Sequence, residues 1–234
     1  MPAVACAVVA FSRRPANMSL THGDTAASLH NRSVFLAHQG VDYRDLVCAR
    51  QVHGDAVVSI NDTDKGRGAC SAETAFADTD ALITATAGVP LAVFTADCLP
   101  ILLYDPQLSC VAAVHAGWRG TKNRIVEKTI LRLRQEYRSD AKDIRAFLGP
   151  CIRSCCYEVG AEFKTFFPDA VRVRDGKVYF DLAEANCVQL RQAGVLAGHI
   201  SDEGMCTSCQ ADDFFSFRRE GAGTGRMMSV IMVR

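Results

Sequence analysis

Three short apolar runs in the middle of the chain decide its fold class: Leu91-Ala92-Val93-Phe94, Ile101-Leu102-Leu103-Tyr104 and Val111-Ala112-Ala113-Val114. They are separated by Asp97-Cys98-Leu99-Pro100 and by Asp105-Pro106-Gln107, segments whose residues favour turns. Apolar runs of this length, bounded by turn residues, are typical of strands that are buried on both faces. The sequence therefore predicts neighbouring buried strands joined by tight turns.

Helical patterns flank these strands. Between Thr121 and Tyr137 the apolar residues fall on one face of a helix, and arginines and lysines lie on the other. Asp181 and Glu184 have the spacing of a capping box, which predicts a second helix ending near Gly194. A third helix is expected from Thr25 to Ala37.

Further strand-like runs occur toward both ends of the chain. They are Ala3 to Phe11, Ala56 to Ile60, Val171 to Val173, Val178 to Phe180 and Ser229 to Val233. Because hairpins and helical crossovers both occur, the pattern favours a mixed or layered α/β (α+β) fold, and no glycine-rich phosphate loop supports a simple Rossmann sheet. No composition shift marks a boundary, so residues 1–234 are expected to form a single domain.

The overall composition restricts the class of function. Of 234 residues, 26 are basic and 26 acidic, which gives a formal net charge of zero, and 49% are apolar. This balance offers no electrostatic surface for nucleic acid or for an anionic membrane. The apolar fraction is that of a chain with a sizeable core, and no membrane span is present. We therefore expect a small-molecule partner.

The cysteines indicate the compartment. Eleven are present, an odd number that argues against a secreted disulfide framework. No basic residue precedes the apolar N-terminal run and no small-residue cleavage site follows it, so we interpret the run as a strand rather than a signal peptide. The sequence predicts a cytoplasmic protein with reduced thiols. The single C-x-x-C from Cys206 to Cys209 and the pair Cys155-Cys156 are expected to be structural thiols.

Three motifs place reactive side chains beside glycine or proline at predicted strand ends: Gln51-Val52-His53-Gly54, Thr95-Ala96-Asp97-Cys98-Leu99-Pro100 and His115-Ala116-Gly117-Trp118-Arg119-Gly120. His53, Cys98 and His115 form a His2Cys set, which zinc accepts with a fourth position open to water or substrate. Two other interpretations stay open. The three can be ordinary packed or hydrogen-bonded residues, or Cys98 and His115 can form a metal-free nucleophile pair.

Together with three further segments, these motifs resemble the laccase-domain family. The further segments are Asp80 to Thr84, Leu148-Gly149-Pro150 with Cys155 to Gly160, and Phe214 to Arg219 with Thr224-Gly225-Arg226. The resemblance extends over nearly the whole chain from Phe11 onward. Members of that family were first described as multicopper polyphenol oxidases and are now regarded as purine nucleoside phosphorylases with adenosine deaminase activity.

The resemblance implies a site, substrates and a fold. It implies a zinc ion held by His53, Cys98 and His115, with phosphate and adenosine, inosine, guanosine or methylthioadenosine as substrates. It also implies a layered α/β/β/α sandwich similar to the catalytic domain of cytotoxic necrotizing factor. A metal-free hydrolase or deamidase that uses Cys98 and His115, and a non-catalytic zinc-binding protein, are the alternatives from other classes.

The histidine content bears on the oxidase alternative. The chain has six histidines and no H-x-H pair, whereas a trinuclear copper cluster needs several histidines beyond the two of a blue-copper centre. A four-copper laccase is therefore difficult to build from this sequence. A single copper ion can still replace zinc in the His2Cys set, because copper(II) binds most nitrogen and sulfur ligand sets more tightly.

Other residues of the motifs have two interpretations each. Arg119 is a candidate for contacting phosphate, because its planar guanidinium suits that anion, or it forms an ion pair that shapes its loop. Asp97 either orients a ligand histidine or caps a turn. The aromatic residues Phe214, Phe215 and Phe217 are expected in the core, with stacking on a base as the alternative.

Overall fold

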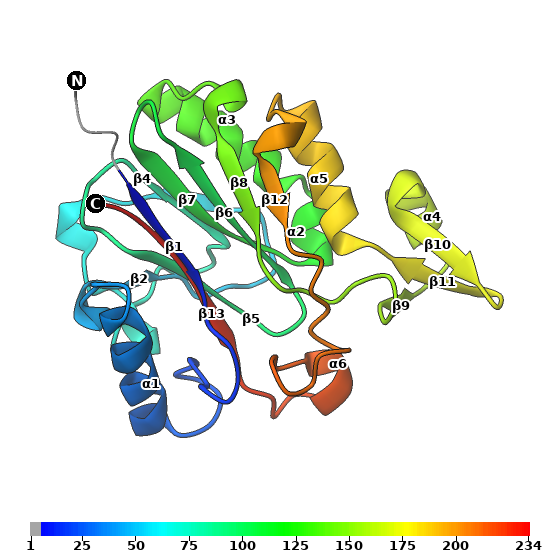
Figure 1. The fold of residues 1–234 in the computed structure, drawn as a ribbon, viewed down its shortest axis with the longest axis horizontal. Helices are drawn as coiled ribbons and strands as arrows, with labels where there is room; N and C mark the ends of the chain where they lie inside the picture. Colours follow the sequence, from blue (N-terminus) through cyan, green and yellow to red (C-terminus); the bar gives the residue numbers. More distant parts are fainter. Residues whose placement is uncertain (1–5) are drawn as a thin grey trace.

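The computed structural model describes residues 6–234 and places most strands in two stacked sheets (Figure 1). The four-stranded sheet has the order β1-β13-β5-β2, formed by Ala7–Phe11, Met227–Val233, Leu91–Thr95 and Val47–Cys48. The six-stranded sheet has the order β12-β8-β6-β7-β4-β3, formed by Ile200–Asp202, Arg145–Leu148, Leu99–Asp105, Cys110–Ala116, Ala81–Thr84 and Val57–Ser59. A small sheet of order β10-β11-β9 projects to one side, formed by Val171–Arg174, Lys177–Phe180 and Glu158–Val159 (Figure 1).

The longer helices cover the outer faces of the two large sheets (Figure 1). Helix α1 (Thr25–Ala37) packs on the four-stranded sheet, and α3 (Ile125–Tyr137) and α5 (Leu182–Gln192) pack on the six-stranded sheet. The short helices are α2 (Trp118–Lys122), α4 (Phe163–Phe166) and α6 (Phe217–Glu220). Within residues 6–234 no helix has the length and apolar character needed to span a bilayer. The cytoplasmic location stays a prediction.

Successive side chains of the central strands are buried in different layers. In β5, Leu91 and Val93 pack between the two sheets, whereas Ala92 packs under α1. In β6, Leu102 packs between the sheets, and Ile101 faces α3 and α5. Both faces of each sheet are therefore apolar, which explains the continuous apolar runs in the sequence. The layers follow the order α/β/β/α within a mixed α/β fold, as predicted; the likeness to cytotoxic necrotizing factor stays a prediction.

The three apolar runs that decide the fold class form β5, β6 and β7, but they belong to two sheets. Strands β6 and β7 pair as an antiparallel hairpin, whereas β5 pairs with β13 and β2 in the other sheet. The expected tight turn after β5 is thus the place where the chain crosses between sheets. Asp97, within this crossing, has a φ of 91°, which side-chain-bearing residues rarely adopt.

The helix expectations are confirmed in two cases and wrong in one. Helix α1 has the expected bounds, and α5 begins after Asp181, whose carboxylate accepts a hydrogen bond from the Glu184 amide at 3.0 Å. The helix expected from Thr121 is interrupted: Arg124 has a φ of 63°, and α3 begins only at Ile125. A left-handed residue ends the helical hydrogen-bond pattern, and apolar periodicity does not reveal it.

The expected N-terminal strand is β1, which covers the part from Ala7 to Phe11. The first residues of that expectation, Ala3 to Ala5, lie outside the described residues. The strand expected from Ala56 to Ile60 contains the shorter β3, and the other expected strands lie within β10, β11 and β13. Strands β8 and β12, which complete one edge of the six-stranded sheet, were not predicted from the sequence.

Leu102 should be a main contributor to the stability of the sandwich. It is fully buried between the two sheets, so Leu102→Ala leaves a cavity and should lower the free energy of unfolding by about 2–5 kcal/mol. Leu131→Ala is the matched control, because Leu131 on α3 is 52% exposed and should change it by less than about 0.5 kcal/mol. Urea denaturation measures both, and equal midpoints for the two variants would contradict the layered packing.

Candidate functional site

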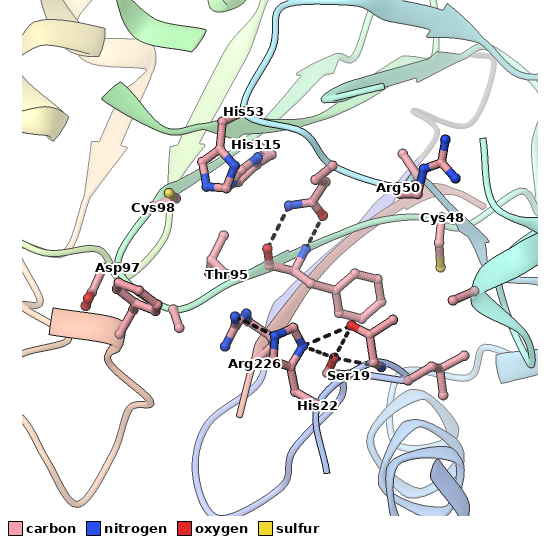
Figure 2. A pocket seen from close by; sticks show the side chains of 18 of the residues that line it. Ser19, His22, Cys48, Arg50, His53, Thr95, Asp97, Cys98, His115 and Arg226 are labelled. Atoms are coloured by element: carbon pink, nitrogen blue, oxygen red, sulfur yellow. Dashed lines mark hydrogen bonds between the residues drawn. The ribbon is translucent and has the colours of Figure 1, made fainter. Parts of the chain in front are cut away.

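The strand register brings Cys98 and His115 together. Cys98 immediately precedes β6, and within the hairpin Leu99 pairs with Ala116 and Pro100 with His115. His53 comes from the loop between β2 and β3, and its ring lies at the edge of the His115 ring, with centroids 4.9 Å apart. The ligand atoms of His53, Cys98 and His115 all lie within 4.8 Å of one another (Figure 2).

A buried carboxylate, Asp80, fixes the geometry of both histidines. It accepts hydrogen bonds from Nδ1 of His115 at 2.7 Å and from the backbone amides of Val52, His53 and Gly54 at 3.2, 3.0 and 2.7 Å. Burial opposes its charge, but the hydrogen bond and the charge of His115, together with the amides of Gly54 and Val52, outweigh burial and hold the pKa of Asp80 below its usual value. With the proton of His115 on Nδ1, its Nε2 lone pair is free for a metal.

The loop that carries His53 is also fastened to the other sheet. The Gln51 side chain accepts a hydrogen bond from the Phe94 amide and donates one to the Phe94 carbonyl, both at 2.8 Å, so that it pairs with the backbone of β5. Asp80 holds the same loop next to β4 and β7. The four residues from Gln51 to Gly54 therefore bridge the two sheets, and this explains the sequence of the first motif.

Two glycines of the third motif allow this loop to approach. A Cβ on Gly117 would lie 3.0 Å from Cδ2 of His53 and 3.1 Å from the Cys98 sulfur. A Cβ on Gly120 would lie 2.8 Å from the carbonyl oxygen of Gly54. The contact at Gly120 is shorter than real Cβ contacts, and those at Gly117 are tighter than most, so both glycines leave the room that the His53 loop needs.

The electrostatics of the site favour a thiolate. Burial alone would raise the pKa of Cys98, but the positive charge of His115 and hydrogen bonds from His115 and His53 lower it to about 6. Burial would likewise lower the pKa of His115, yet the Cys98 thiolate and the Asp80 carboxylate raise it to about 9. Thiolate is the form in which cysteine ligates metals or acts as a nucleophile. Two imidazoles and a thiolate in this arrangement are able to hold one metal ion.

The three residues form one wall of a pocket of about 660 Å³ (Figure 2). This volume falls within the range of about 300–1,000 Å³ that is typical of small-molecule sites. Ser19, His22 and Arg226 lie on the opposite side of the pocket, and much of the remaining lining is apolar. The pocket therefore combines an apolar chamber with polar groups at both ends.

Five arginines line this pocket, among them Arg119 and Arg226. Arg119, on α2, lies against the Trp118 ring at 4.6 Å, and within residues 6–234 it forms no ion pair, so the loop-shaping alternative is not realised there. Arg226 donates to the carbonyl of Thr224 at 2.7 Å and contacts Nε2 of His22 at 3.1 Å. The sequence interpretation missed Arg226, although its Thr-Gly-Arg motif was a signal for it.

Asp97 caps loops and does not orient a histidine. Its carboxylate accepts hydrogen bonds from the Thr207 hydroxyl at 2.6 Å and from the Arg218 amide at 2.7 Å. The orienting carboxylate is Asp80, which the sequence interpretation left without a role. The signal was present, because an aspartate directly before the apolar strand β4 requires a buried partner.

The aromatic segment divides between core and pocket. Phe214 and Phe215 are buried, as expected from the sequence. Phe217 is instead 53% exposed and lines the pocket together with Trp118 and Tyr157. These three rings offer faces on which a planar ligand can stack.

A second group of thiols gathers outside the pocket. Its members are Cys155, Cys156, Cys206 and Cys209, whose sulfur atoms all lie within 4.8 Å of one another. The sequence predicts structural thiols at both pairs but not that the pairs meet, because they are about fifty residues apart in the chain.

Known proteins resemble the chain over nearly its whole length. A family model described as multi-copper polyphenol oxidoreductase laccase matches residues 9–234. A purine nucleoside phosphorylase of Bacteroides thetaiotaomicron is 35% identical over 221 residues, which cover 90% of this chain and 82% of the relative. Adenosine deaminase RL5, from an unknown prokaryotic organism, is 39% identical over 220 residues, 89% of this chain and 83% of the relative. The crystal structure of YlmD from Geobacillus stearothermophilus has a TM-score of 0.90 at 33% identity, covering all of this chain and 94% of that one.

The coupling between Asp80, His115 and Cys98 is testable by the reactivity of the thiol. In metal-stripped protein, alkylation of Cys98 by iodoacetamide should rise with pH around a midpoint near the pKa of about 6. Asp80→Asn should move the midpoint toward the ordinary cysteine value of about 8.5. Without the carboxylate the pKa of His115 falls, so the imidazolium that stabilises the thiolate is less populated. Peptide mass spectrometry measures the modification at Cys98 alone.

Asp78→Asn is the control for this variant. Asp78 is exposed and pairs with Arg50, so its loss should leave the midpoint unchanged. An unshifted midpoint in Asp80→Asn would show that Asp80 does not control the charge of His115.

Proposed function

The chain belongs to the multi-copper polyphenol oxidoreductase laccase family, and we propose that it is a zinc-dependent purine nucleoside phosphorylase with adenosine deaminase activity. The observation that carries the proposal is the His53, Cys98 and His115 set on the wall of a pocket of nucleoside size. Relatives named purine nucleoside phosphorylase and adenosine deaminase support the choice of reaction. The proposed substrates are adenosine, inosine, guanosine and methylthioadenosine.

The donor set suits zinc, and a copper ion can occupy the same set. His53, Cys98 and His115 would hold the metal, with Asp80 retaining the proton on Nδ1 of His115 so that Nε2 is the ligand atom. A bound zinc ion supplies positive charge that polarises an oxygen of water or phosphate. The other steps depend on residues of the chain.

Phosphorolysis requires an anion and a leaving purine in the same pocket. A phosphate oxygen forms a bond to ribose C1′ while the bond from C1′ to purine N9 breaks. The purine leaves with a proton on a ring nitrogen, and the products are free purine and ribose 1-phosphate. Arg119 is the proposed phosphate contact, and Arg226 adds positive charge at the far end. Phe217 and Tyr157 offer aromatic faces to the base.

Deamination is the second proposed activity of the same site, a hydrolase reaction beside the transferase reaction. Water adds at C6 of adenosine and ammonia leaves, which gives inosine. The 39% identity to a relative named adenosine deaminase favours this activity. A four-copper oxidase needs several histidines gathered at one place. Among the metal-ligand groups of residues 6–234, His53 and His115 are the only two histidines that lie together, so the oxidase alternative has less support.

Inosine isolates the glycosidic step, because it has no amino group to lose. We expect inosine with phosphate to give hypoxanthine and ribose 1-phosphate, and we expect this reaction to stop without phosphate, the proposed nucleophile. Chromatography of the products measures both. Cys98→Ala and His53→Ala should abolish the reaction.

Other products would identify other functions. Free ribose formed at an unchanged rate without phosphate identifies a nucleoside hydrolase. Ammonia from adenosine without any cleavage of inosine leaves only the deaminase. Full activity in His53→Ala or in strong chelator favours the metal-free Cys98 and His115 pair.

Arg119→Lys keeps the positive charge and loses the planar fork. If Arg119 holds phosphate through two hydrogen bonds, the KM for phosphate should rise about tenfold, the equivalent of about 1.4 kcal/mol, with a smaller change in kcat. Arg50→Lys is the control on the same pocket rim, because Asp78 already pairs with that guanidinium. Steady-state rates at varied phosphate measure the effect, and equal KM values for Arg119→Lys and the unmodified protein would remove Arg119 from the phosphate site.

A further inference from the structure

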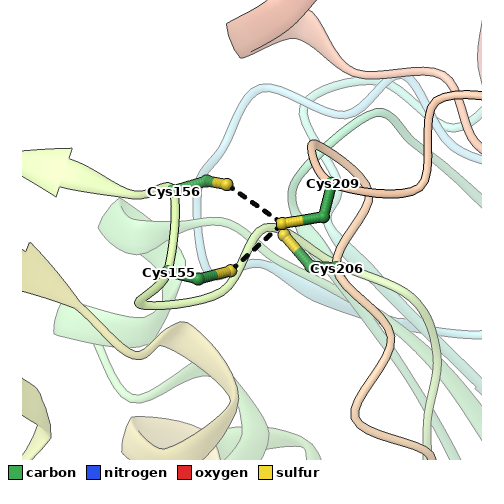
Figure 3. A group of neighbouring side chains, drawn as sticks. All are labelled: Cys155, Cys156, Cys206 and Cys209. Atoms are coloured by element: carbon green, nitrogen blue, oxygen red, sulfur yellow. Dashed lines mark hydrogen bonds between the residues drawn. The ribbon is translucent and has the colours of Figure 1, made fainter.

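The four-cysteine cluster lies between two segments that are far apart in the sequence. Cys155 and Cys156 follow β8, and Cys206 and Cys209 lie between β12 and α6 (Figure 3). The sulfur of Cys209 is 3.4 Å from that of Cys155 and 3.3 Å from that of Cys156. All four sulfurs point toward one centre from the two loops (Figure 3).

The backbone holds the two loops together without any help from the sulfurs. Cys151 and Cys206 form a parallel β-bridge, in which the Thr207 amide donates to the Cys151 carbonyl at 3.1 Å. The Arg153 guanidinium is hydrogen-bonded to the segment that leads into the same loop. It donates to the Met205 carbonyl at 3.2 Å and to the Asp202 carboxylate at 2.7 Å. The fold itself therefore preorganises the cluster.

The spacing of the sulfurs fits tetrahedral zinc. With a Zn–S distance of about 2.3 Å, two ligands of a tetrahedron lie about 3.8 Å apart. The observed separations of 3.3 and 3.4 Å, within an overall limit of 4.8 Å, are close to this value. A disulfide needs about 2.05 Å, so the cluster has the spacing of a ligand set and not of two bonded pairs.

Core packing does not account for the cluster. Cysteines that serve as small apolar residues are buried, as Cys110 and Cys151 are, whereas Cys155 and Cys209 are exposed and Cys156 is partly exposed. The cluster contains no carboxylate or imidazole, which makes it a purely soft ligand set.

The C-x-x-C loop also has hydrogen bonds suited to a thiolate. Backbone amides of Cys209, Arg153 and Ser208 donate to the sulfur of Cys206. Amide hydrogen bonds of this kind stabilise negative charge on a metal-binding sulfur.

We propose that Cys155, Cys156, Cys206 and Cys209 bind a structural zinc ion, distinct from a metal at His53, Cys98 and His115. Four thiolates complete the coordination and leave no open position for substrate, so the role of the ion is to cross-link the two loops. On binding, the thiols release their protons and form four zinc–sulfur bonds, with no change of oxidation state.

The cross-link would support the neighbouring pocket. Thr207, inside the C-x-x-C loop, donates its hydroxyl to Asp97 at 2.6 Å, and Asp97 is adjacent to Cys98. Arg219 donates to the carbonyls of Thr207 and Ser208 at 2.7 and 3.0 Å. Fixing this loop therefore fixes the crossing between the sheets from which Cys98 projects.

Zinc stoichiometry in the full chain tests the proposal. We expect two zinc ions per chain in the unmodified protein, and one in the double variant Cys155→Ser/Cys209→Ser. Cys6→Ser is the control, because Cys6 is exposed and remote from the cluster in the sequence, and it should keep two. His53→Ala should lose only the other ion. The loss of one zinc ion in the double variant relative to the unmodified protein is the decisive result, and it is expected whether or not the proposed function is correct.

The environment of the ion provides a second measurement that does not depend on how the double variant folds. In His53→Ala, X-ray absorption at the zinc edge should report four sulfur ligands near 2.3 Å and no nitrogen. Full zinc content in the double variant, a nitrogen-containing shell in His53→Ala, iron in place of zinc, or a disulfide in freshly purified protein would each overturn the proposal.

Discussion

The site depends on one buried carboxylate. Asp80 is fully buried and accepts four hydrogen bonds, three from backbone amides of the His53 loop and one from His115. A buried charge is costly unless each of its oxygens is satisfied, and here the donors come from two separate parts of the chain. These hydrogen bonds therefore stabilise the charge of Asp80 and hold the His53 loop in place. They also set which nitrogen of His115 faces the pocket. If the carboxylate were lost, the loop and the imidazole would lose their common partner.

Around this carboxylate, the two sheets provide a rigid frame. The chain leaves the four-stranded sheet after β5 and enters the six-stranded sheet at β6, so Cys98 lies where the sheets separate. On one side of Cys98, apolar side chains such as Leu102 fill the space between the sheets. On the other side the pocket opens, and Cys98 is part of its lining. Side chains on or next to strands are positioned more precisely than those on loops, which suits a ligand set that includes Cys98 and His115.

The two cysteine-containing sites are linked through Asp97. Its backbone is held in a left-handed conformation, and its carboxylate is bound by the loop that carries Cys206 and Cys209. A strained residue of this kind persists only when its surroundings hold it in place. The conformation of the loop that carries Cys206 and Cys209 is thus connected to the position of Cys98 through the hydrogen bond between Thr207 and Asp97. The cysteine cluster itself lies outside the pocket.

The sequence by itself determined the features that depend on local patterns. Buried strands, the bounds of α1 and the N-cap of α5 follow from apolar periodicity and capping residues, and the motifs containing His53, Cys98 and His115 follow from residue chemistry. Only the tertiary structure decided that β5 belongs to the four-stranded sheet and that the two distant cysteine pairs meet. It also decided that Asp80, and not Asp97, orients a histidine. These outcomes depend on contacts between residues that are far apart in the sequence, such as the amide of His53 with Asp80, Leu91 with Ile231, and the sulfurs of Cys155 and Cys209. Such contacts form only when the sheets pack, because no local preference of the chain encodes them.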